Sequence, residues 1–236
     1  MDIKNAVVLV TGANRGLGQA FVKELLAAGV KKVYAAARDP STITIDGVER
    51  VRLDVTRPED IASAARRCSN VTLLINNAGV SRGSPFLAAG SAAAARSELE
   101  TNFFGPLAMS QAFAPVLAAN GGGVIVNVLS VLSWLNASLA ATYSASKSAA
   151  WSLTNGLRNE LRGQGTQVLA LHVGFMDTDM TKGIDAPKAN PGDVVRQTLE
   201  ALAAGREEVL ADDLTRQVKR GLSAEHGVYL GEQAAR

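Results

Sequence analysis

The stretch Thr11-Gly12-Ala13-Asn14-Arg15-Gly16-Leu17-Gly18 decides the fold, because it joins a compact apolar run, Ala6–Val10, to an amphipathic stretch, Leu17–Ala28. Glycines in such a turn let backbone N–H groups approach a diphosphate, and the following helix offers unpaired donors and a positive dipole end. The spacing is Gly-x-x-x-Gly-x-Gly, not the commonest dinucleotide fingerprint, and no P-loop lysine follows. A tight connection without a ligand is the alternative. The position after the first apolar run favours dinucleotide binding.

Outward from this turn, short apolar runs alternate with helix-length segments to the end of the chain. Strands apolar on both faces and separated by helices indicate a parallel sheet covered on both sides. The right-handed crossover rule then favours a doubly wound arrangement. No linker or repeat interrupts the pattern, so we expect a single α/β domain over residues 1–236. The expected strands are Ala6–Val10, Lys32–Ala36, Val48–Leu53, Val71–Ile75, Val124–Val128, Gln167–Val173 and Glu208–Leu210. The expected helices are Leu17–Ala28, one starting near Thr56, Ala92–Ala119 divided around Gly105-Pro106, Tyr143–Arg162 and Asp193–Ala203.

Composition excludes several classes of protein. The chain has 24 Lys and Arg against 22 Asp and Glu, with no basic run, which argues against nucleic-acid binding. One cysteine, Cys68, excludes an intramolecular disulfide and fits a reducing compartment, and we expect it to be structural. The sequence shows no signal-peptide pattern and no uncharged run near the ~20 residues of a membrane helix. We therefore expect a cytoplasmic protein that does not enter the membrane.

The end of the second expected strand bears on the type of dinucleotide. In such folds an acidic residue there binds the adenosine ribose, whereas an arginine accommodates a 2′-phosphate. This strand ends Ala35-Ala36-Ala37-Arg38, without a carboxylate, and Arg15 in the turn could add a second cationic contact. The residues therefore favour NADP(H), with no metal. Asp39 keeps NAD(H) open, and Arg38 could also be a solvated loop residue.

Tyr143 and Lys147 are four residues apart at the start of an expected helix, which places both side chains on one face. A phenol has a pKa near 10 and is a poor base at neutral pH. A nearby ammonium group favours the phenolate and lowers that pKa. The pair is therefore a candidate acid/base system, although Tyr-x-x-x-Lys alone is common.

Several motifs occur together in a fixed order. These are Thr11–Gly18, Asn76-Asn77-Ala78-Gly79, Ser130 and Tyr143-Ser144-Ala145-Ser146-Lys147. In order and spacing they resemble the short-chain dehydrogenase/reductase family, from residue 3 to about residue 215. The resemblance implies a Rossmann-like domain with a seven-stranded parallel sheet, an NADP(H)-preferring carbonyl reductase type of activity, and a homodimer or homotetramer.

The resemblance also implies the catalytic roles. Tyr143 would protonate the carbonyl oxygen as hydride arrives, and Lys147 would lower the tyrosine pKa and hold the nicotinamide ribose. Ser130 would bind the substrate oxygen; Ser133 is a competitor whose spacing to Tyr143 fits less well. Asn102 would organise a water-linked proton relay to the lysine, or it is an ordinary buried polar residue.

Other matching positions imply contacts with the cofactor. After the sixth strand the family usually has Pro-Gly, but this chain has Val173-Gly174, which leaves the course of the loop less certain. His172 just before it is expected to pack or cap rather than act as a base. The expected cofactor-binding residues are Gly12, Asn14, Arg15, Gly16, Leu17, Gly18, Arg38, Asp54, Val55, Asn76, Ala78, Gly79, Tyr143, Lys147, Gly174 and Thr178.

The segments expected near the nicotinamide are apolar, which predicts a neutral, hydrophobic ketone, aldehyde or secondary alcohol as substrate. They contain Phe86, Leu87, Val131, Leu132, Trp134, Leu135, Phe175 and Met176. The chemical alternative is reduction of another polarised double bond such as an imine. A nucleotide sensor is the non-enzymatic alternative, but such relatives typically lack the tyrosine or the lysine. A halide-eliminating relative is disfavoured, because that chemistry pairs tyrosine with arginine.

Overall fold

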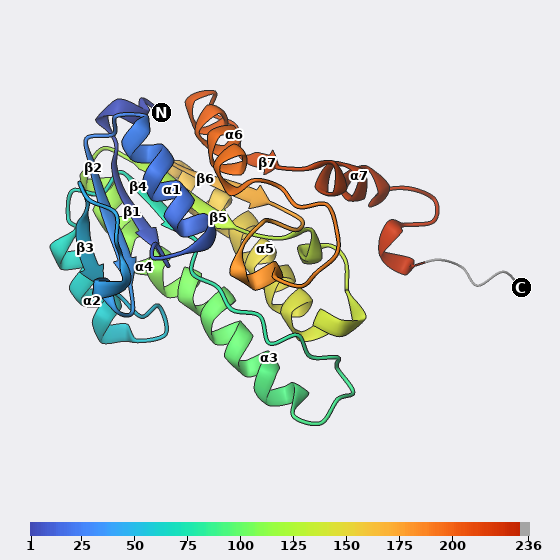
Figure 1. Cartoon of the computed structure of the whole chain (residues 1–236). Coiled ribbons are helices and arrows are strands. Elements are labelled where there is room, and N and C mark those ends of the chain that lie inside the picture. The colour runs from blue at the N-terminus through green and yellow to red at the C-terminus, as the bar shows by residue number, and fades with distance from the viewer. Residues whose placement is uncertain (232–236) are drawn as a thin grey trace, which may run out of the picture.

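Seven parallel strands form the centre of the molecule in this computed structural model, which describes residues 1–231. Their order across the sheet is β3-β2-β1-β4-β5-β6-β7, so the chain starts in the middle and winds outward in both directions (Figure 1). This confirms the doubly wound, seven-stranded α/β fold. The strands are β1 (Val7–Thr11), β2 (Lys32–Ala37), β3 (Glu49–Arg52), β4 (Leu73–Asn76), β5 (Gly123–Val128), β6 (Thr166–His172) and β7 (Glu208–Leu210).

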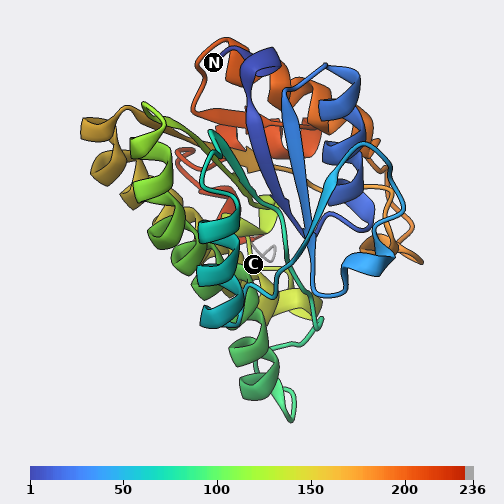
Figure 2. The same ribbon diagram turned by 90° about the vertical axis from the view of Figure 1, so that its left-hand side faces the viewer.

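Helices cover both faces of the sheet, as the view along its edge shows (Figure 2). Helices α1 (Gly16–Ala27) and α6 (Pro191–Ala203) bury one set of alternating strand residues. Helices α2 (Pro58–Arg67), α4 (Gly105–Ala119) and α5 (Ala141–Leu161) bury the other set. Strands β1, β4, β5 and β6 are therefore buried on both sides, which explains their nearly continuous apolar sequence.

The expected long helix 92–119 is divided by a π-helical turn. Helix α3 (Ser91–Leu99) runs into η3 (Glu100–Phe104), whose wider winding continues directly into α4. The predicted interruption around Gly105-Pro106 lies immediately C-terminal to the observed one. Pro106, the second residue of α4, has no N–H to donate to the preceding turn, and the wider turn of η3 lies directly before it. Such π-turns occur frequently at functional sites, and this one carries the buried side chain of Asn102.

The remaining differences from the expected elements lie at the edges. Strand β3 is an edge strand with only Val51 buried, so the expectation that every strand is apolar on both faces fails there. Helix α7 (Asp213–Gly221) was not expected, although Asp212 and Thr215 form a capping box at its start. Single-turn helices fill several loops: η1 (Ile3–Asn5), η2 (Pro40–Thr42), η4 (Val131–Ser133), η5 (Ser138–Ala140), η6 (Arg162–Gln164), η7 (Asp179–Thr181) and η8 (Val228–Leu230).

The C-terminal segment has no legible sequence motif, yet part of it packs on the molecule. Val218 of α7 and Val228 of η8 join Val131 and Trp134 in a small apolar cluster beside η4. Residues 232–236 lie outside the described residues. None of the helices in residues 1–231 combines the length and apolar character that crossing a membrane requires.

Candidate active site

The turn after β1 is shaped by three glycines. Gly12 and Gly16 have positive φ angles of 64° and 52°, a region that favours glycine. At Gly18, a Cβ atom would lie 2.1 Å from the Gly12 carbonyl oxygen and 2.5 Å from Asn77 Nδ2, so no larger residue fits. The first turn of α1 thus packs directly on the loop, with Leu17 buried in the core. The unpaired N–H groups of a helix N-terminus are suited to binding an anion.

Thr11 and Asn77 hold this turn against the end of β4. The Thr11 hydroxyl donates to Ile75 O (3.2 Å) and accepts from the N–H groups of Asn77 and Ala78 (3.0 Å each). The Asn77 amide in turn donates to the carbonyl oxygens of Thr11 (2.8 Å) and Gly12 (3.2 Å). We expected no role for either residue. Their position at the ends of two adjacent strands was the feature of the sequence that could have indicated one.

The expected adenosine-binding residues gather at the ends of β2 and β3. Arg38 follows β2 and is exposed, and its charge acts on Asp54. Burial opposes ionisation of Asp54, but hydrogen bonds from Thr56 and the charges of Arg38 and Arg57 outweigh it, so its pKa lies below the usual range. Next to it, Val55 is buried against Gly105, where a Cβ would come within 2.9 Å of the valine side chain.

Arg15, at the start of α1, is also exposed, and its guanidinium lies 4.0 Å from the Asp179 carboxylate. Both side chains are largely in solvent, so the pair contributes little to stability. Neighbouring Asn14 is half-buried. Arg15 and Arg38 are therefore two accessible cations, one at the start of α1 and one directly after β2.

A buried chain of polar side chains fixes the end of β4 to α5. Asn76 donates to Asn127 Oδ1 (2.8 Å), and Asn127 donates to Thr154 Oγ1 (2.9 Å). Asn76 thus links β4 to β5 and, through Asn127, to α5. After it, the chain continues through Ala78 and Gly79 toward the site. A Cβ at Gly79 would lie 3.2 Å from Asn102 Oδ1 and 3.8 Å from Lys147 Nζ, so this backbone passes close to both.

The candidate catalytic residues come from three elements and converge. Ser130 caps η4 after β5, with its hydroxyl accepting from Leu132 N (3.1 Å), and this hydroxyl is near enough to the phenol of Tyr143 on α5 to lower the pKa of the tyrosine. Ser133, the competitor, instead accepts from Ser130 N (3.2 Å) and is buried. Ser130 is therefore the serine that meets the tyrosine.

Lys147 lies one turn beyond Tyr143 on α5 and is almost fully buried. Its ammonium donates to Val128 O (2.8 Å) and lies 5.7 Å from the centre of the Tyr143 ring. Asn102 Nδ2 donates to Val80 O and Ser146 Oγ, and its Oδ1 accepts from Val80 N, each at 2.9 Å. Asn102 thus links the loop after β4 to α5, the helix that carries both candidate residues.

Burial sets the protonation of the tyrosine and lysine. Burial, and to a smaller extent the charge of Glu98, raise the pKa of Tyr143 to about 12, and the Ser130 hydroxyl opposes this rise. Burial lowers the pKa of Lys147 to about 8. The predicted lowering of the tyrosine pKa by Lys147 is not seen: the pKa of Tyr143 is raised, mainly because the phenol is buried. Glu98 is, after Thr11 and Asn77, a third residue for which we expected no role.

The loop after β6 runs across the glycine turn. Val131 N donates to Val173 O (2.9 Å), so the chain leaves the sheet beside η4 although the proline is absent. Gly174 N donates to Asp212 Oδ2 (2.6 Å). Thr178 lies opposite Gly16, where a Cβ would come within 3.5 Å of the threonine methyl. The loop after β6 therefore packs against the glycine turn.

His172 is fully buried at the end of β6, as expected of a packing residue. Its ring stacks on Trp134 with centroids 3.9 Å apart, and Nδ1 lies 3.3 Å from Ser130 O. Burial lowers its pKa to about 3, so the ring is neutral. Cys68 is likewise structural: it ends α2, is fully buried, and burial raises its thiol pKa to about 12.

The apolar residues expected beside the nicotinamide divide into three groups. Val131 and Trp134 are buried in the cluster formed with α7. Leu132, Leu135 and Met176 are half-buried. Phe86, Leu87 and Phe175 are exposed, at 52%, 101% and 37%. Within residues 1–231, no three His, Cys, Asp or Glu side chains come together to hold a metal ion.

Known proteins are similar to this chain in sequence and in fold. A family model described as short chain dehydrogenase matches residues 6–189. A short chain dehydrogenase from Burkholderia cenocepacia, solved in complex with NADP, is 40% identical, is matched over 95% of each chain, and has a TM-score of 0.92. The NADPH-bound carbonyl reductase from chicken fatty liver is 30% identical over 84% of this chain and 91% of its own, with a TM-score of 0.75. By sequence, the 3-oxoacyl-[acyl-carrier-protein] reductase of Vibrio cholerae is 30% identical over 216 residues, 87% of this chain and 85% of its own.

Proposed function

Because this chain belongs to the short-chain dehydrogenase family and is an oxidoreductase of that family, we propose that it reduces a carbonyl with NADPH, or oxidises the matching alcohol with NADP⁺. The observation that carries the proposal is the convergence of Ser130, Tyr143 and Lys147 from η4 and α5 at the carboxyl edge of the sheet. That edge, beside the point where strand order reverses, is where ligands bind in doubly wound sheets.

The glycine turn fits a dinucleotide. The close packing at Gly18 sets the N-terminus of α1 against the turn, an arrangement that suits a diphosphate, and Thr178 lies against Gly16. When bound, the nicotinamide supplies the hydride. Arg38 and Arg15 favour the 2′-phosphate form, since both are accessible cations on the adenosine side and no carboxylate ends β2. The relative from Burkholderia cenocepacia, solved with NADP, supports the same preference.

In the proposed reaction, the Tyr143 hydroxyl donates its proton to the carbonyl oxygen, and in reverse its phenolate accepts the alcohol proton. Ser130 donates a hydrogen bond to the same oxygen and stabilises the charge that develops there. Lys147 would hold the ribose of the cofactor when it is bound, and its ammonium group would return a proton to the tyrosine. Asn102 hydrogen-bonds Val80 and Ser146 of α5, and so fixes the loop after β4 against the helix that carries Tyr143 and Lys147.

The proposed substrate is a neutral, hydrophobic ketone or aldehyde, or a secondary alcohol. Phe86, Leu87 and Phe175 are exposed apolar side chains on the loops that border the site. We further propose that residues 1–236 act as one domain in a cytoplasmic homodimer or homotetramer, without nucleic acid or membrane as a partner. Light scattering of the purified protein tests the oligomeric state.

The test of this function is a titration of the protein with NADPH and NADH side by side, followed by addition of an aromatic ketone. We expect tighter binding of NADPH and loss of its absorbance on adding the ketone. Binding of neither cofactor would contradict the proposal.

Substitution Tyr143→Phe removes only the hydroxyl that moves the proton. Because general acid–base catalysis contributes about 10²–10⁴-fold, we expect kcat to fall by at least that factor while the Kd for NADPH changes by no more than a few-fold. Full activity in this variant would exclude the mechanism without excluding the cofactor.

A further inference from the structure

Asp212 uses both of its carboxylate oxygens to join helix α7 to the loop after β6. Its Oδ1 accepts from Thr215 N (2.8 Å) at the start of α7, and its Oδ2 accepts from Gly174 N (2.6 Å). An aspartate at the N-cap needs one oxygen to serve its own helix. The second oxygen is therefore available for a contact outside α7, and it binds a backbone N–H that lies 38 residues earlier in the chain.

The carboxylate of Asp212 is held in a fixed place. The residue is half-buried, and in the capping box the Thr215 hydroxyl donates to Asp212 O (2.8 Å) and accepts from Asp212 N (3.3 Å). The loop approaches it closely, because a Cβ at Gly174 would lie 3.2 Å from Asp212 Oδ2 and 3.2 Å from Leu214 Cδ2. The bond from Gly174 thus attaches the loop to a rigid point.

Gly174 lies where the chain leaves β6 for the candidate active site. On its N-terminal side, the preceding carbonyl oxygen accepts from Val131 N (2.9 Å), directly after Ser130. On its C-terminal side, the loop continues to Thr178, which lies against the glycine turn. The bond to Asp212 therefore fixes the backbone between the proposed catalytic serine and the turn proposed to bind the cofactor.

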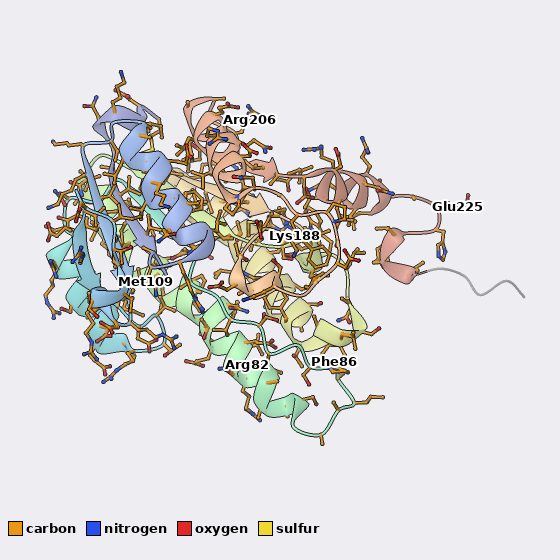
Figure 3. The ribbon with its side chains drawn as sticks, in the orientation of Figure 1. Arg82, Phe86, Met109, Lys188, Arg206 and Glu225 are labelled. Carbon is orange, nitrogen blue, oxygen red and sulfur yellow. The ribbon has the colours of Figure 1, made fainter. Side chains whose placement is uncertain are left out.

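The other hydrogen bonds of this loop are internal. Ala189 N donates to Phe175 O (2.8 Å), and Ala189 O accepts from Asp177 N (3.1 Å), next to Lys188 at the far end of the loop in Figure 3. Among residues 1–231, the bond from Gly174 is the one hydrogen bond that joins residues 174–189 to another part of the protein.

An ion pair also reaches this loop from α1. The Arg15 guanidinium lies 4.0 Å from the Asp179 carboxylate, but both side chains are largely in solvent and hold the loop weakly. The internal bonds therefore set the shape of the loop, whereas Asp212 sets its place on the protein.

We propose that Asp212 is a positioning residue for the reaction: by holding Gly174 N, its Oδ2 sets the course of the loop after β6 beside Ser130 and the glycine turn. The proposal rests on the function proposed above. It gives Asp212 no contact with substrate, cofactor or the reacting atoms. Without this bond, the loop keeps its internal pairs but loses its attachment to α7.

Asp212→Ser separates the two contacts of the carboxylate. Serine caps a helix as well as aspartate does, but its single Oγ serves Thr215 N and leaves Gly174 N without a partner. Because a displacement of about 1 Å at a reacting centre can cost about 10²-fold, we expect kcat for the ketone to fall roughly ten- to hundredfold. The Kd for NADPH should change far less, since the glycine turn is untouched. If Asp212→Ser does not fold, Asp212→Asn should give the same result, because its one amide oxygen keeps the cap and its NH₂ group faces Gly174 N.

Thr215→Val is the control for the stability of α7. It removes the hydroxyl from the capping box and leaves Asp212 Oδ2 bonded to Gly174. We expect Thr215→Val to lower the thermal midpoint at least as much as Asp212→Ser does, with kcat and KM close to those of the wild type. Equal losses of kcat in the two variants would overturn the proposal, because the stability of α7 would then set the activity.

Amide hydrogen exchange of the protein without cofactor gives a readout that needs no turnover. In peptides that cover residues 173–178, exchange should be faster in Asp212→Ser than in the wild type and unchanged in Thr215→Val, since only the first variant frees Gly174 N. Unchanged exchange in Asp212→Ser would overturn the role of Asp212. Faster exchange in that variant together with a wild type that shows no turnover would overturn the proposed function and leave the attachment of the loop in place.

Discussion

The turn between β1 and α1 is held by contacts near their steric limit, whereas the loops after β4 and β6 present apolar side chains to solvent. On the first side, Gly18 leaves no room for a Cβ, and Thr11 is saturated with hydrogen bonds. On the second, Leu87 is fully exposed, and Met180 and Ile184 are 53% and 40% exposed. The turn between β1 and α1, which we call the cofactor side, is therefore fixed by the backbone of this chain. The loops after β4 and β6, which we call the substrate side, have few such constraints on their side chains.

Gly18→Ala should break the cofactor side with the largest effect. The added methyl would meet a backbone oxygen at 2.1 Å, which cannot move without displacing Gly12. Overpacking of this kind costs about 3 kcal/mol or more, so we expect a large loss of unfolding free energy and at least a hundredfold weaker NADPH binding. Chemical denaturation and fluorescence titration measure the two effects.

Gly156→Ala is the matched control for that substitution. Gly156 lies within α5, and a Cβ there would have no atom within 4 Å. Because alanine is a better helix former than glycine, we expect a gain of up to about 1 kcal/mol and unchanged cofactor binding. Equal losses in the two variants would mean that close packing at the turn is not what holds the cofactor side together.

The same contrast explains what could be predicted from sequence. The strands and the positions of Tyr143, Lys147 and Ser130 could be predicted because each depends on a pattern of residues that are close together in the sequence. Thr11, Asn77 and Glu98 were missed because their roles depend on segments that meet only in the folded chain. The apolar residues near the site were recognisable as such, but which of them would be buried under α7 depended on a helix that was not expected.

Protonation of His172 at low pH should destabilise the protein at the end of β6, next to the substrate side. Its pKa is about 3 in the folded protein, against about 6.5 when unfolded, because burial opposes its charge. The unfolded chain therefore binds the proton first, so stability is complete above about pH 6.5 and is lost as the pH falls toward 3. At pH 5 the loss from this residue is about 2 kcal/mol.

His172→Phe keeps a ring that can stack on Trp134 and removes the titration. We expect its unfolding free energy to fall about 2 kcal/mol less than that of the wild type between pH 7.5 and pH 5, as measured by urea denaturation. If the unfolding free energy of the two proteins fell equally with pH, His172 would not be held neutral in the folded protein. The end of β6 would then be more accessible to water than its burial indicates.

Arg38→Asp sharpens the comparison on the cofactor side without disturbing the fold. Arg38 is exposed, so its loss should leave stability within about 0.5 kcal/mol. A charge-assisted bond to the 2′-phosphate is worth about 1.5–3 kcal/mol, so NADPH binding should weaken by roughly 10- to 100-fold and NADH binding by a few-fold at most. Arg66→Asp, an equal charge change at an exposed position of α2, is the control. Equal weakening of both cofactors would remove the basis for the NADPH preference.

The smallest effect is expected at Leu87, on the substrate side. Its side chain is fully exposed, so Leu87→Ser removes no buried apolar surface from the folded chain. We expect the unfolding free energy to change by no more than about 0.5 kcal/mol and KM for a hydrophobic ketone to change by a few-fold at most. A thermal melt and a substrate titration measure both. A loss of about 1.5 kcal/mol or more would mean that something covers this loop in solution, and because a single chain leaves it bare, the cover would have to be a ligand or a second molecule. The substrate side would then be as fixed as the cofactor side, but by association rather than by its own backbone.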